Sequence, residues 1–196
     1  MSEQDLDELP DSRQKSWLAR TGNFLFELIK IAVLAGVTIG LVRYFLFKPF
    51  YVKGQSMEPN FEERDYLIID ELSYRFRIPQ RGEVVVFHYR ATDDYFLKRI
   101  IGLPGERVKV DGNKVVVYND ANPQGMILPE IYLTEDTPGT VTITLGQNQY
   151  FVMGDNRDAS FDSRRFGAID RADIVGRVWL RGWPVSRVST FSPPTY

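Results

Sequence analysis

One long apolar segment near the N-terminus limits what this chain can fold into. The segment reads FLFELIKIAVLAGVTIGLVRYFLFKPF and runs from Phe24 to Phe50. Its uncharged core, Ile31 to Val42, has 12 residues, whereas a bilayer crossing needs roughly 20 mainly apolar residues. Lys30 and Arg43 border the core, where long cations reach the headgroups, and the aromatic residues of RYFLF suit a membrane interface. With these flanks the segment predicts an uncleaved transmembrane anchor over residues 23–47.

The flanking sequence separates this anchor from its alternatives. A cleaved signal peptide needs a small-residue cleavage site directly after its core, and VRYFLFKPF offers none. A surface-bound or buried helix stays open as the minority interpretation. Positive charges are nearly even on the two sides, so the residues alone leave the orientation open. These charges are Arg13, Lys15 and Arg20 before the core, and Arg43, Lys48 and Lys53 after it.

Composition narrows the function classes. The 196 residues carry 24 Lys+Arg against 26 Asp+Glu, a net charge of -2, which disfavours a nucleic-acid partner. The chain has no cysteine and one histidine, His88. Thiol catalysis and Cys-based zinc sites are therefore excluded, and a His-based triad is disfavoured. Because no His and carboxylate pattern has metal-ligand spacing, we expect neither a metal nor a cofactor.

Beyond about Phe50 the sequence pattern changes to short β-type runs separated by turn residues. KVDGNKVVV predicts a hairpin whose Asp-Gly-Asn corner accepts positive φ. Asn119 to Gly139 lacks clean periodicity and carries three prolines, so it predicts an excursion or small subdomain inserted into a mainly β core. The expected strands lie in YLIID, GEVVVFHY, YFLKRIIGL, RVKVDGNKVVVY, TVTITLG, QYFVMGD and IVGRVWLRGWP.

Two segments suggest nucleophilic chemistry. In FYVKGQSMEPNF, Ser56 lies in a Gly/Pro-bounded loop that can expose a hydroxyl beside backbone N–H groups, although a plain turn explains it too. In YFLKRIIGLPGE, strand alternation puts Lys98 on one face with Phe96 and Ile100, and Arg99 on the other face. Lysine is a base only when neutral, which costs about 4.6 kcal/mol at pH 7 from its ordinary pKa. Burial can supply this free energy if no carboxylate touches the amine.

A third segment, GDNRDASFDSRRFG, concentrates charges in one loop. Such loops are usually solvated. If the loop serves the lysine, we expect its acids to pair with its own arginines, which would make it rigid and leave Lys98 without a counter-ion. The residues of this expected structural ionic loop are Asp155, Arg157, Asp162 and Arg164.

These segments resemble the signature blocks of bacterial type I signal peptidases, also called leader peptidases, which are membrane-anchored Ser/Lys endopeptidases. The family's serine block, roughly S-M-x-P, is SMEP here, and its RGD-V-V-F-like strand is RGEVVVF. Its lysine block is KRIIGLPGE and its last block is GDNRDASFDSR. The four blocks occur in family order behind a membrane segment, and the resemblance covers most of the chain.

The resemblance implies a role for each matched position. Ser56 matches the nucleophile, Lys98 the general base, and Ser160 the hydroxyl that helps to orient the lysine amine. The Ser56 backbone N–H matches an oxyanion donor, and Gly54 stands where one branch of the family has a second, hydroxyl donor. The positions that match the walls of the substrate pockets are Val52, Met57, Phe61, Phe96 and Leu97.

The resemblance also implies an organisation and a substrate. It implies a polar tail over residues 1–22, the anchor over 23–47, and a β-rich catalytic domain over 48–196 with a small inserted subdomain at about 107–149. The implied substrates are exported preproteins with small residues at the first and third positions before the cut. The N-terminus would be cytoplasmic, and the catalytic domain would lie on the outer side of the cell membrane.

Two other functions stay open on the sequence. A self-cleaving repressor-type protease also places a Ser-Met-x-Pro loop before a lysine strand, but it needs an N-terminal DNA-binding helix-turn-helix where this chain has its apolar segment. A non-catalytic, membrane-anchored β binding module would keep the same fold without depending on Ser56.

Overall fold

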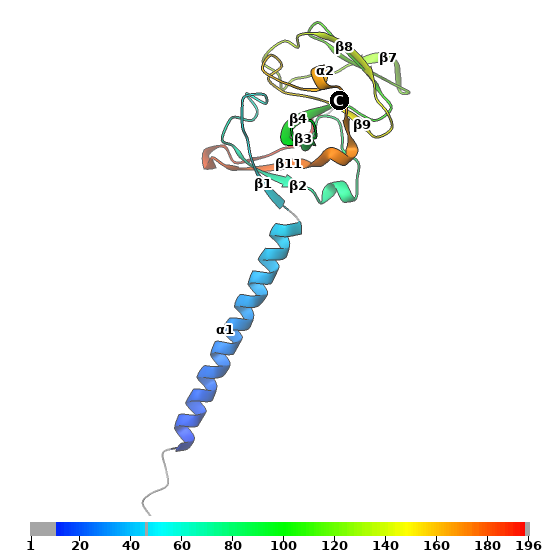
Figure 1. The fold of residues 1–196 in the computed structure, drawn as a ribbon. Helices are drawn as coiled ribbons and strands as arrows, with labels where there is room; N and C mark the ends of the chain where they lie inside the picture. The colour runs from blue at the N-terminus through cyan, green and yellow to red at the C-terminus, as the bar shows by residue number, and fades with distance from the viewer. Residues whose placement is uncertain (1–10, 46, 195–196) are drawn as a thin grey trace, which may run out of the picture. The chain divides into compact units, whose positions relative to one another are not determined.

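The computed structural model describes the backbone of residues 11–45 and 47–194, and the side chains of residues 22–40 and 48–194. Three parts of the sequence predictions lie outside the described residues: 1–10 of the polar tail, 46 in the anchor, and 195–196 at the end of the β domain. The chain divides into two compact units, residues 1–45 and residues 46–196 (Figure 1).

The first unit is the helix α1 (Asp11–Phe45). Its stretch Gly22–Gly40 has 19 residues and a mean hydropathy of 1.7, so it is long and apolar enough to cross a membrane. The side chains of residues 22–40 are exposed, Phe26 and Leu34 at 66% each, and a helix that is apolar on all sides suits lipid better than water. The helix begins at Asp11, before the predicted anchor; the predicted limits of tail, anchor and β domain stay predictions.

The second unit is mainly β, as the sequence predicts, and its strands form two antiparallel sheets (Figure 1). The larger sheet has eight strands in the order β1-β2-β11-β3-β4-β9-β10, with β12 paired to β11. It contains β1 (Phe47–Tyr51), β2 (Tyr66–Asp70), β3 (Val84–Tyr89), β4 (Asp94–Gly102), β9 (Gln149–Met153), β10 (Ile169–Asp170), β11 (Ile174–Trp183) and β12 (Ser189–Thr190).

The smaller sheet has four strands in the order β7-β6-β5-β8 and lies in sequence between β4 and β9. Its strands are β5 (Arg107–Asp111), β6 (Val115–Asn119), β7 (Asn122–Ile127) and β8 (Thr140–Thr144). Short helical turns join the strands of the unit: η1 (Ser73–Arg75), α2 (Ser163–Phe166), η2 (Arg171–Asp173) and η3 (Val185–Arg187).

The predicted strands form, and the predicted hairpin joins β5 to β6 with Gly112 at φ 41° and Asn113 at φ 63°. The stretch Asn119 to Gly139, predicted as an excursion or small subdomain, contains one strand that was not among the expected ones, β7, which pairs with β6. The strand was missed because it lies at a sheet edge and buries no side chain fully, so it has no clean alternation. Its Gly125 makes room for the Tyr118 ring, which a Cβ would overlap.

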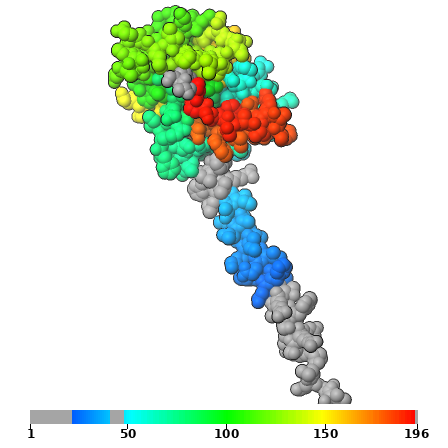
Figure 2. Space-filling view, turned by 180° about the vertical axis from the view of Figure 1, so that it is seen from behind, coloured from blue at the N-terminus to red at the C-terminus, as the bar shows by residue number. Residues whose placement is uncertain are grey.

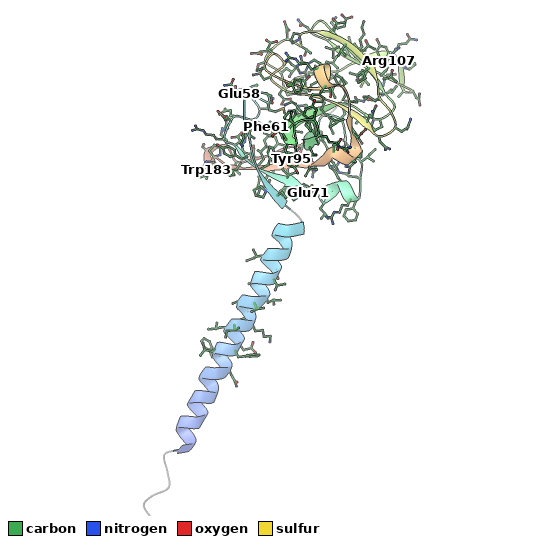
Figure 3. The ribbon with its side chains drawn as sticks, in the orientation of Figure 1. Glu58, Phe61, Glu71, Tyr95, Arg107 and Trp183 are labelled. Carbon is green, nitrogen blue, oxygen red and sulfur yellow. The ribbon has the colours of Figure 1, made fainter. Side chains whose placement is uncertain are left out.

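Strand β4 connects the hydrophobic clusters of this unit. Leu97 belongs to the cluster that underlies the Ser56 loop, Ile100 to a cluster beside β3 and β9, and Ile101 to the cluster between the two sheets. In Figure 3 the labelled Phe61 and Tyr95 lie in the larger sheet's half of the unit, and Arg107 lies in the smaller sheet. Because close-packed interiors resist deformation, β4 is a rigid support for Lys98.

The C-terminal segment completes the larger sheet. Strand β11 pairs with both β2 and β3, and β12 folds back onto β11. In Figure 2 this orange and red segment lies beside the cyan residues of the early strands. The Phe191 ring then packs on Phe61 with ring centroids 4.5 Å apart, so the end of the chain closes the core beneath the Ser56 loop.

Gly102 offers a test of this packing. A Cβ there would overlap the side chains of Val108 and Leu145 between the two sheets. We expect Gly102→Ala to lower the free energy of unfolding by about 1–3 kcal/mol, because overpacking displaces a well-packed core. The measurement is denaturant unfolding in detergent. Gly182→Ala is the control, since its Cβ would meet nothing within 4 Å. Equal stability of the two variants would contradict the close approach of the two sheets at Gly102.

Candidate active site

The structure brings the two predicted reactive side chains together. Lys98 Nζ lies 2.7 Å from Ser56 Oγ, although the residues are 42 positions apart in the chain. The amine also donates to the Leu97 carbonyl at 3.0 Å. Within the described residues, no carboxylate lies within ion-pair distance of this amine. The amine is therefore held by neutral oxygen atoms, as a lysine that must lose its proton requires.

Lys98 is buried, with 4% of its surface exposed. Burial lowers the pKa of Lys98 to about 8, and the nearby charges of Asp162 and Asp155 act in the opposite direction without cancelling this effect. At pH 7 the free energy needed to deprotonate the amine is then about 1.4 kcal/mol. The neutral form is accessible near neutral pH.

The Ser56 loop is held by backbone hydrogen bonds. Asn156 N–H donates to the Ser56 carbonyl at 3.1 Å, and Glu58 N–H donates to the Gln55 carbonyl at 3.1 Å. Gly54 has φ 79°, a conformation that favours glycine. Among the described hydrogen bonds none uses the Ser56 N–H, so this donor is available to a ligand beside the hydroxyl.

A groove of about 500 Å³ contains Ser56 and Lys98. Of the five predicted substrate-contacting residues, Val52, Met57, Phe96 and Leu97 line it. Phe61 does not: it is fully buried in the same hydrophobic cluster as Val52 and Met57 and supports the groove wall from behind. The other lining residues are Phe50, Tyr51, Lys53, Gly54, Gln55, Asp93, Asp94, Tyr95, Ala159 and Phe161.

One wall of the groove is an open strand edge. Strand β4 pairs with β3 from Asp94 to Arg99, but it pairs with β9 only from Arg99 onward. Within the described residues, 94–98 therefore have a partner strand on one side only. Free backbone groups at such an edge can bind an extended peptide as an added strand.

The residues of the predicted ionic loop are mostly buried, but the expectation that its acids pair with its own arginines is right for Asp162 and wrong for Asp155. Asp162 does pair within the loop, with Arg164 at 2.8 Å. Asp155 instead pairs with Arg99 of β4 at 2.6 Å, and Arg157 pairs with Glu130, which lies between β7 and β8. Sequence proximity favoured local pairs, whereas the fold brings buried partners from other segments.

Arg99 is the second cation of the lysine strand, and it too is buried, with 7% of its surface exposed. Its guanidinium donates to both Asp155 oxygens, at 2.8 and 2.6 Å, and to the Gly82 carbonyl at 2.8 Å. Neighbouring basic residues on opposite faces of β4 therefore differ in their surroundings: the arginine has a carboxylate partner, whereas the lysine has none within ion-pair distance among the residues whose side chains are described.

Ser160 is buried near the reactive pair. Its hydroxyl makes no hydrogen bond to another described residue, although it lies close enough to Asp162 to contribute to lowering that carboxyl's pKa. Gly154 separates Ser160 from the Ser56 loop, and a Cβ at Gly154 would overlap both the Ser160 side chain and the Ser56 carbonyl. The lysine-orienting role of Ser160 stays a prediction.

Sequence reasoning missed several residues that support the site. Glu130 and Thr137 bind the Arg157 guanidinium, and the Tyr132 ring lies 4.0 Å from the Arg99 guanidinium. All three belong to the segment without periodicity. A glutamate between apolar residues in LPEIYL is a weak signal for a buried ion pair.

A mainly β domain in which a buried lysine with a lowered pKa faces a serine in a groove has the features of a serine hydrolase that uses lysine in place of histidine. The chain matches the family described as signal peptidase, peptidase S26, over residues 25–183. It belongs to this family, whose members are serine endopeptidases.

Individual proteins agree with this assignment. The chain is 40% identical over 177 residues to a probable signal peptidase I-2 of Synechocystis sp., covering 85% of this chain and 77% of that protein. It is 35% identical over 181 residues to signal peptidase I of Leptolyngbya laminosa, covering 87% and 85%. It is 34% identical over 180 residues to signal peptidase IB of Staphylococcus aureus, covering 85% and 93%.

A solved structure, signal peptidase I from Enterococcus faecalis, is 30% identical, with a TM-score of 0.45, and the match covers 52% of this chain and 97% of that one. The family match and the relatives support the signal peptidase over the two alternatives, the repressor-type protease and the non-catalytic module.

Gly154→Ala tests the close packing behind the reactive pair. The new methyl group must displace Ser160 or the Ser56 carbonyl, and small misplacements of reacting groups are costly, so we expect kcat to fall by at least about 10-fold. Peptide cleavage in detergent measures this, with the thermal unfolding midpoint as a check on folding. Gly146→Ala should behave like the unchanged chain, because its Cβ would meet only the flexible Gln149 side chain. Full activity of Gly154→Ala would show that this contact does not position Ser56.

Proposed function

We propose that the protein is a membrane-bound signal peptidase that cuts exported preproteins with Ser56 as nucleophile and neutral Lys98 as general base. The observation that carries the proposal is the 2.7 Å contact between Lys98 Nζ and Ser56 Oγ, made by a buried amine without a carboxylate at ion-pair distance among the described residues. The family assignment supports the class of reaction.

The proposed chemistry needs no group from outside the chain and the substrate except water. The Lys98 amine takes the Ser56 hydroxyl proton as the oxygen attacks the scissile carbonyl carbon. The Ser56 N–H donates to the developing oxyanion. The ammonium then protonates the leaving amine, the carbon–nitrogen bond breaks, and an ester remains on Ser56. Water, deprotonated by the same lysine, hydrolyses the ester and restores the serine.

The groove suits an extended peptide. We propose that the substrate pairs with the open edge of β4 at residues 94–98, so that backbone hydrogen bonds fix its register. Val52, Met57, Phe96 and Leu97 would then enclose the side chains before the cut. Because these walls are buried and packed, they would admit only small side chains at the first and third positions before the cut.

The membrane anchor would keep the groove near its substrate. The family is membrane-associated, and α1 is apolar enough to cross a bilayer. We propose a single crossing with a cytoplasmic N-terminus and the β domain on the outer side, where signal peptides emerge. This orientation rests on the family resemblance.

Three substitutions test the reactive pair. We expect Ser56→Ala, Lys98→Ala and Lys98→Arg each to abolish cleavage of a preprotein in detergent. Arginine keeps the positive charge but cannot give up its proton near neutral pH. Lys109→Ala should stay active, because Lys109 is an exposed partner of Asp111 in the smaller sheet. An active Lys98→Arg variant would exclude lysine as the base.

The pH profile tests the state of Lys98. The reactive form is deprotonated, so kcat should rise with pH, reach half its plateau near pH 8, and stay high above it, in line with the lowered pKa of Lys98. Asp162→Asn removes a negative charge that favours the ammonium form and leaves Arg164 unpaired. The lost negative charge and the unpaired guanidinium both disfavour the ammonium form of Lys98, so the midpoint of the profile, the pH at which kcat reaches half its plateau, should fall.

Asp111→Asn is the control for this profile. Its carboxylate is exposed and bound to Lys109, so the midpoint should not move. A midpoint that moves to higher pH in Asp162→Asn, or a kcat that does not change between pH 7 and pH 9 in the unchanged chain, would contradict the proposed base.

A further inference from the structure

We propose that Asn60 is a positioning residue: through Asp155 its side-chain amide holds the Ser56 loop in register with Lys98. The inference deepens the proposed Ser56–Lys98 mechanism and rests on it. Asn60 follows Ser56 by four residues in the same loop, and it touches neither reacting atom.

The Asn60 amide uses both of its protons. Nδ2 donates to Asp155 Oδ2 at 2.9 Å and to the Tyr132 carbonyl oxygen at 2.9 Å. A side-chain amide has two N–H donors, so this nitrogen is fully satisfied. The serine loop is thereby joined both to the loop that follows β9 and to the segment between β7 and β8.

Asp155 links Asn60 to the strand that contains the base, Lys98. The same carboxylate binds Arg99 through two hydrogen bonds, and Arg99 directly follows Lys98 in β4. Charge-assisted, two-point bonds of this kind are strong and have a fixed geometry. One buried carboxylate therefore contacts the nucleophile's loop on one side and the base's strand on the other.

A second bond makes the attachment two-point. Asn156 N–H donates to the Ser56 carbonyl at 3.1 Å, so the dipeptide Asp155–Asn156 holds the serine loop at Ser56 and again at Asn60. The loop lies outside the strands, and no ladder of sheet hydrogen bonds fixes its distance from β4. Arg181 of β11 also donates to the Asn60 carbonyl at 3.2 Å, but the two bonds to Asp155 and Asn156 are those that join the serine loop to the carboxylate bound by Arg99 of β4.

The chemistry of the amide suits the place. It donates to Asp155 without adding charge beside an amine that must stay neutral. A carboxylate at position 60 would face Asp155 with like charge and could not donate. A hydroxyl could donate one bond of the two, and an aliphatic side chain none. These differences predict the order of kcat among variants at position 60: serine highest, an aliphatic residue lower, and aspartate lowest.

The chain contains a matched control. Asn119 Nδ2 donates to Glu106 Oε1 at 2.8 Å, and Glu106 pairs with Arg81 at 2.5 Å. The sequence of groups is the same, an amide, a carboxylate and a guanidinium, and the site is similarly half-buried. Asn119 lies in the smaller sheet and lines no part of the groove. Its Oδ1 also accepts two hydrogen bonds from Asn122, so its loss reports the structural cost of removing such an amide away from the groove.

The experiment compares Asn60→Leu, Asn60→Ser, Asn60→Asp and Asn119→Leu in the full chain in detergent, with a signal-peptide substrate. We expect Asn60→Leu to lower kcat by about 10- to 100-fold, because small misplacements of reacting groups are costly. KM should stay within about twofold, since Asn60 is not part of the groove. The midpoint of the pH profile should not move, because Asn60 carries no charge.

In the other variants, kcat should follow the number of hydrogen bonds that the side chain at position 60 can donate. Asn60→Ser should recover part of kcat, and Asn60→Asp should fall below Asn60→Leu. Asn119→Leu should lose thermal stability to a similar extent as Asn60→Leu and keep the kcat of the unchanged chain.

Two results would overturn the inference: equal kcat in Asn60→Leu and Asn119→Leu, or an Asn60→Ser variant no better than Asn60→Asp. Ser56→Ala and Lys98→Ala, measured alongside, separate this failure from a failure of the proposed mechanism. If both are inactive while Asn60→Leu is fully active, only the positioning role is wrong. If either retains activity, the proposed nucleophile and base are wrong.

Discussion

The burial of one amine, with no counter-ion in contact among the described residues, is the constraint on which the rest of this structure depends. An ammonium group loses its hydration when it is buried, so the fold favours the neutral form of Lys98 and lowers its pKa to about 8. Below that pH the native state holds a desolvated charge that the unfolded chain would hydrate, at a cost of about 3 kcal/mol. The cost shrinks as pH rises from 8 toward the ordinary lysine pKa. The remaining structure must offset it without supplying an acid to the amine.

The buried charges around Lys98 are arranged to meet this condition. Asp155 is occupied by Arg99 and Asn60, and Asp162 is occupied by Arg164 and the Gly154 N–H. Each carboxylate is thus neutralised by a nearby guanidinium, which weakens its pull on the lysine proton. Strand β4 keeps the amine in place because its apolar residues belong to all three hydrophobic clusters. The packing of β4 and the ion pairs of the two carboxylates therefore both allow the amine to stay buried without an acid in contact with it.

The sequence predicted what local patterns encode. Short β-type runs predicted the main strands, and the Asp-Gly-Asn corner predicted the β5–β6 hairpin. The apolar core together with its cationic and aromatic flanks predicted a helix that can cross a membrane. It could not predict which acid meets which arginine, because Arg99–Asp155 and Arg157–Glu130 join residues 56 and 27 positions apart. Nor could it show that Phe61 lies behind the groove, since an apolar residue at a loop end fits a wall and a core equally well. Long-range contacts of buried polar groups decide the site, and no short window of sequence contains them.

The attachment of the smaller sheet has a consequence for how the chain can vary. The segment between β7 and β8 supplies Glu130 and Thr137 to the fully buried Arg157, and the Tyr132 carbonyl to Asn60. Deleting the whole insertion would leave a guanidinium in the interior without its carboxylate, a far larger loss than the removal of surface strands. The β6–β7 turn is held as well, because Asn119 at the end of β6 donates to the buried Glu106 at 2.8 Å. Changes of chain length should therefore be excluded in the segment between β7 and β8, which supplies the buried partners of Arg157 and Asn60.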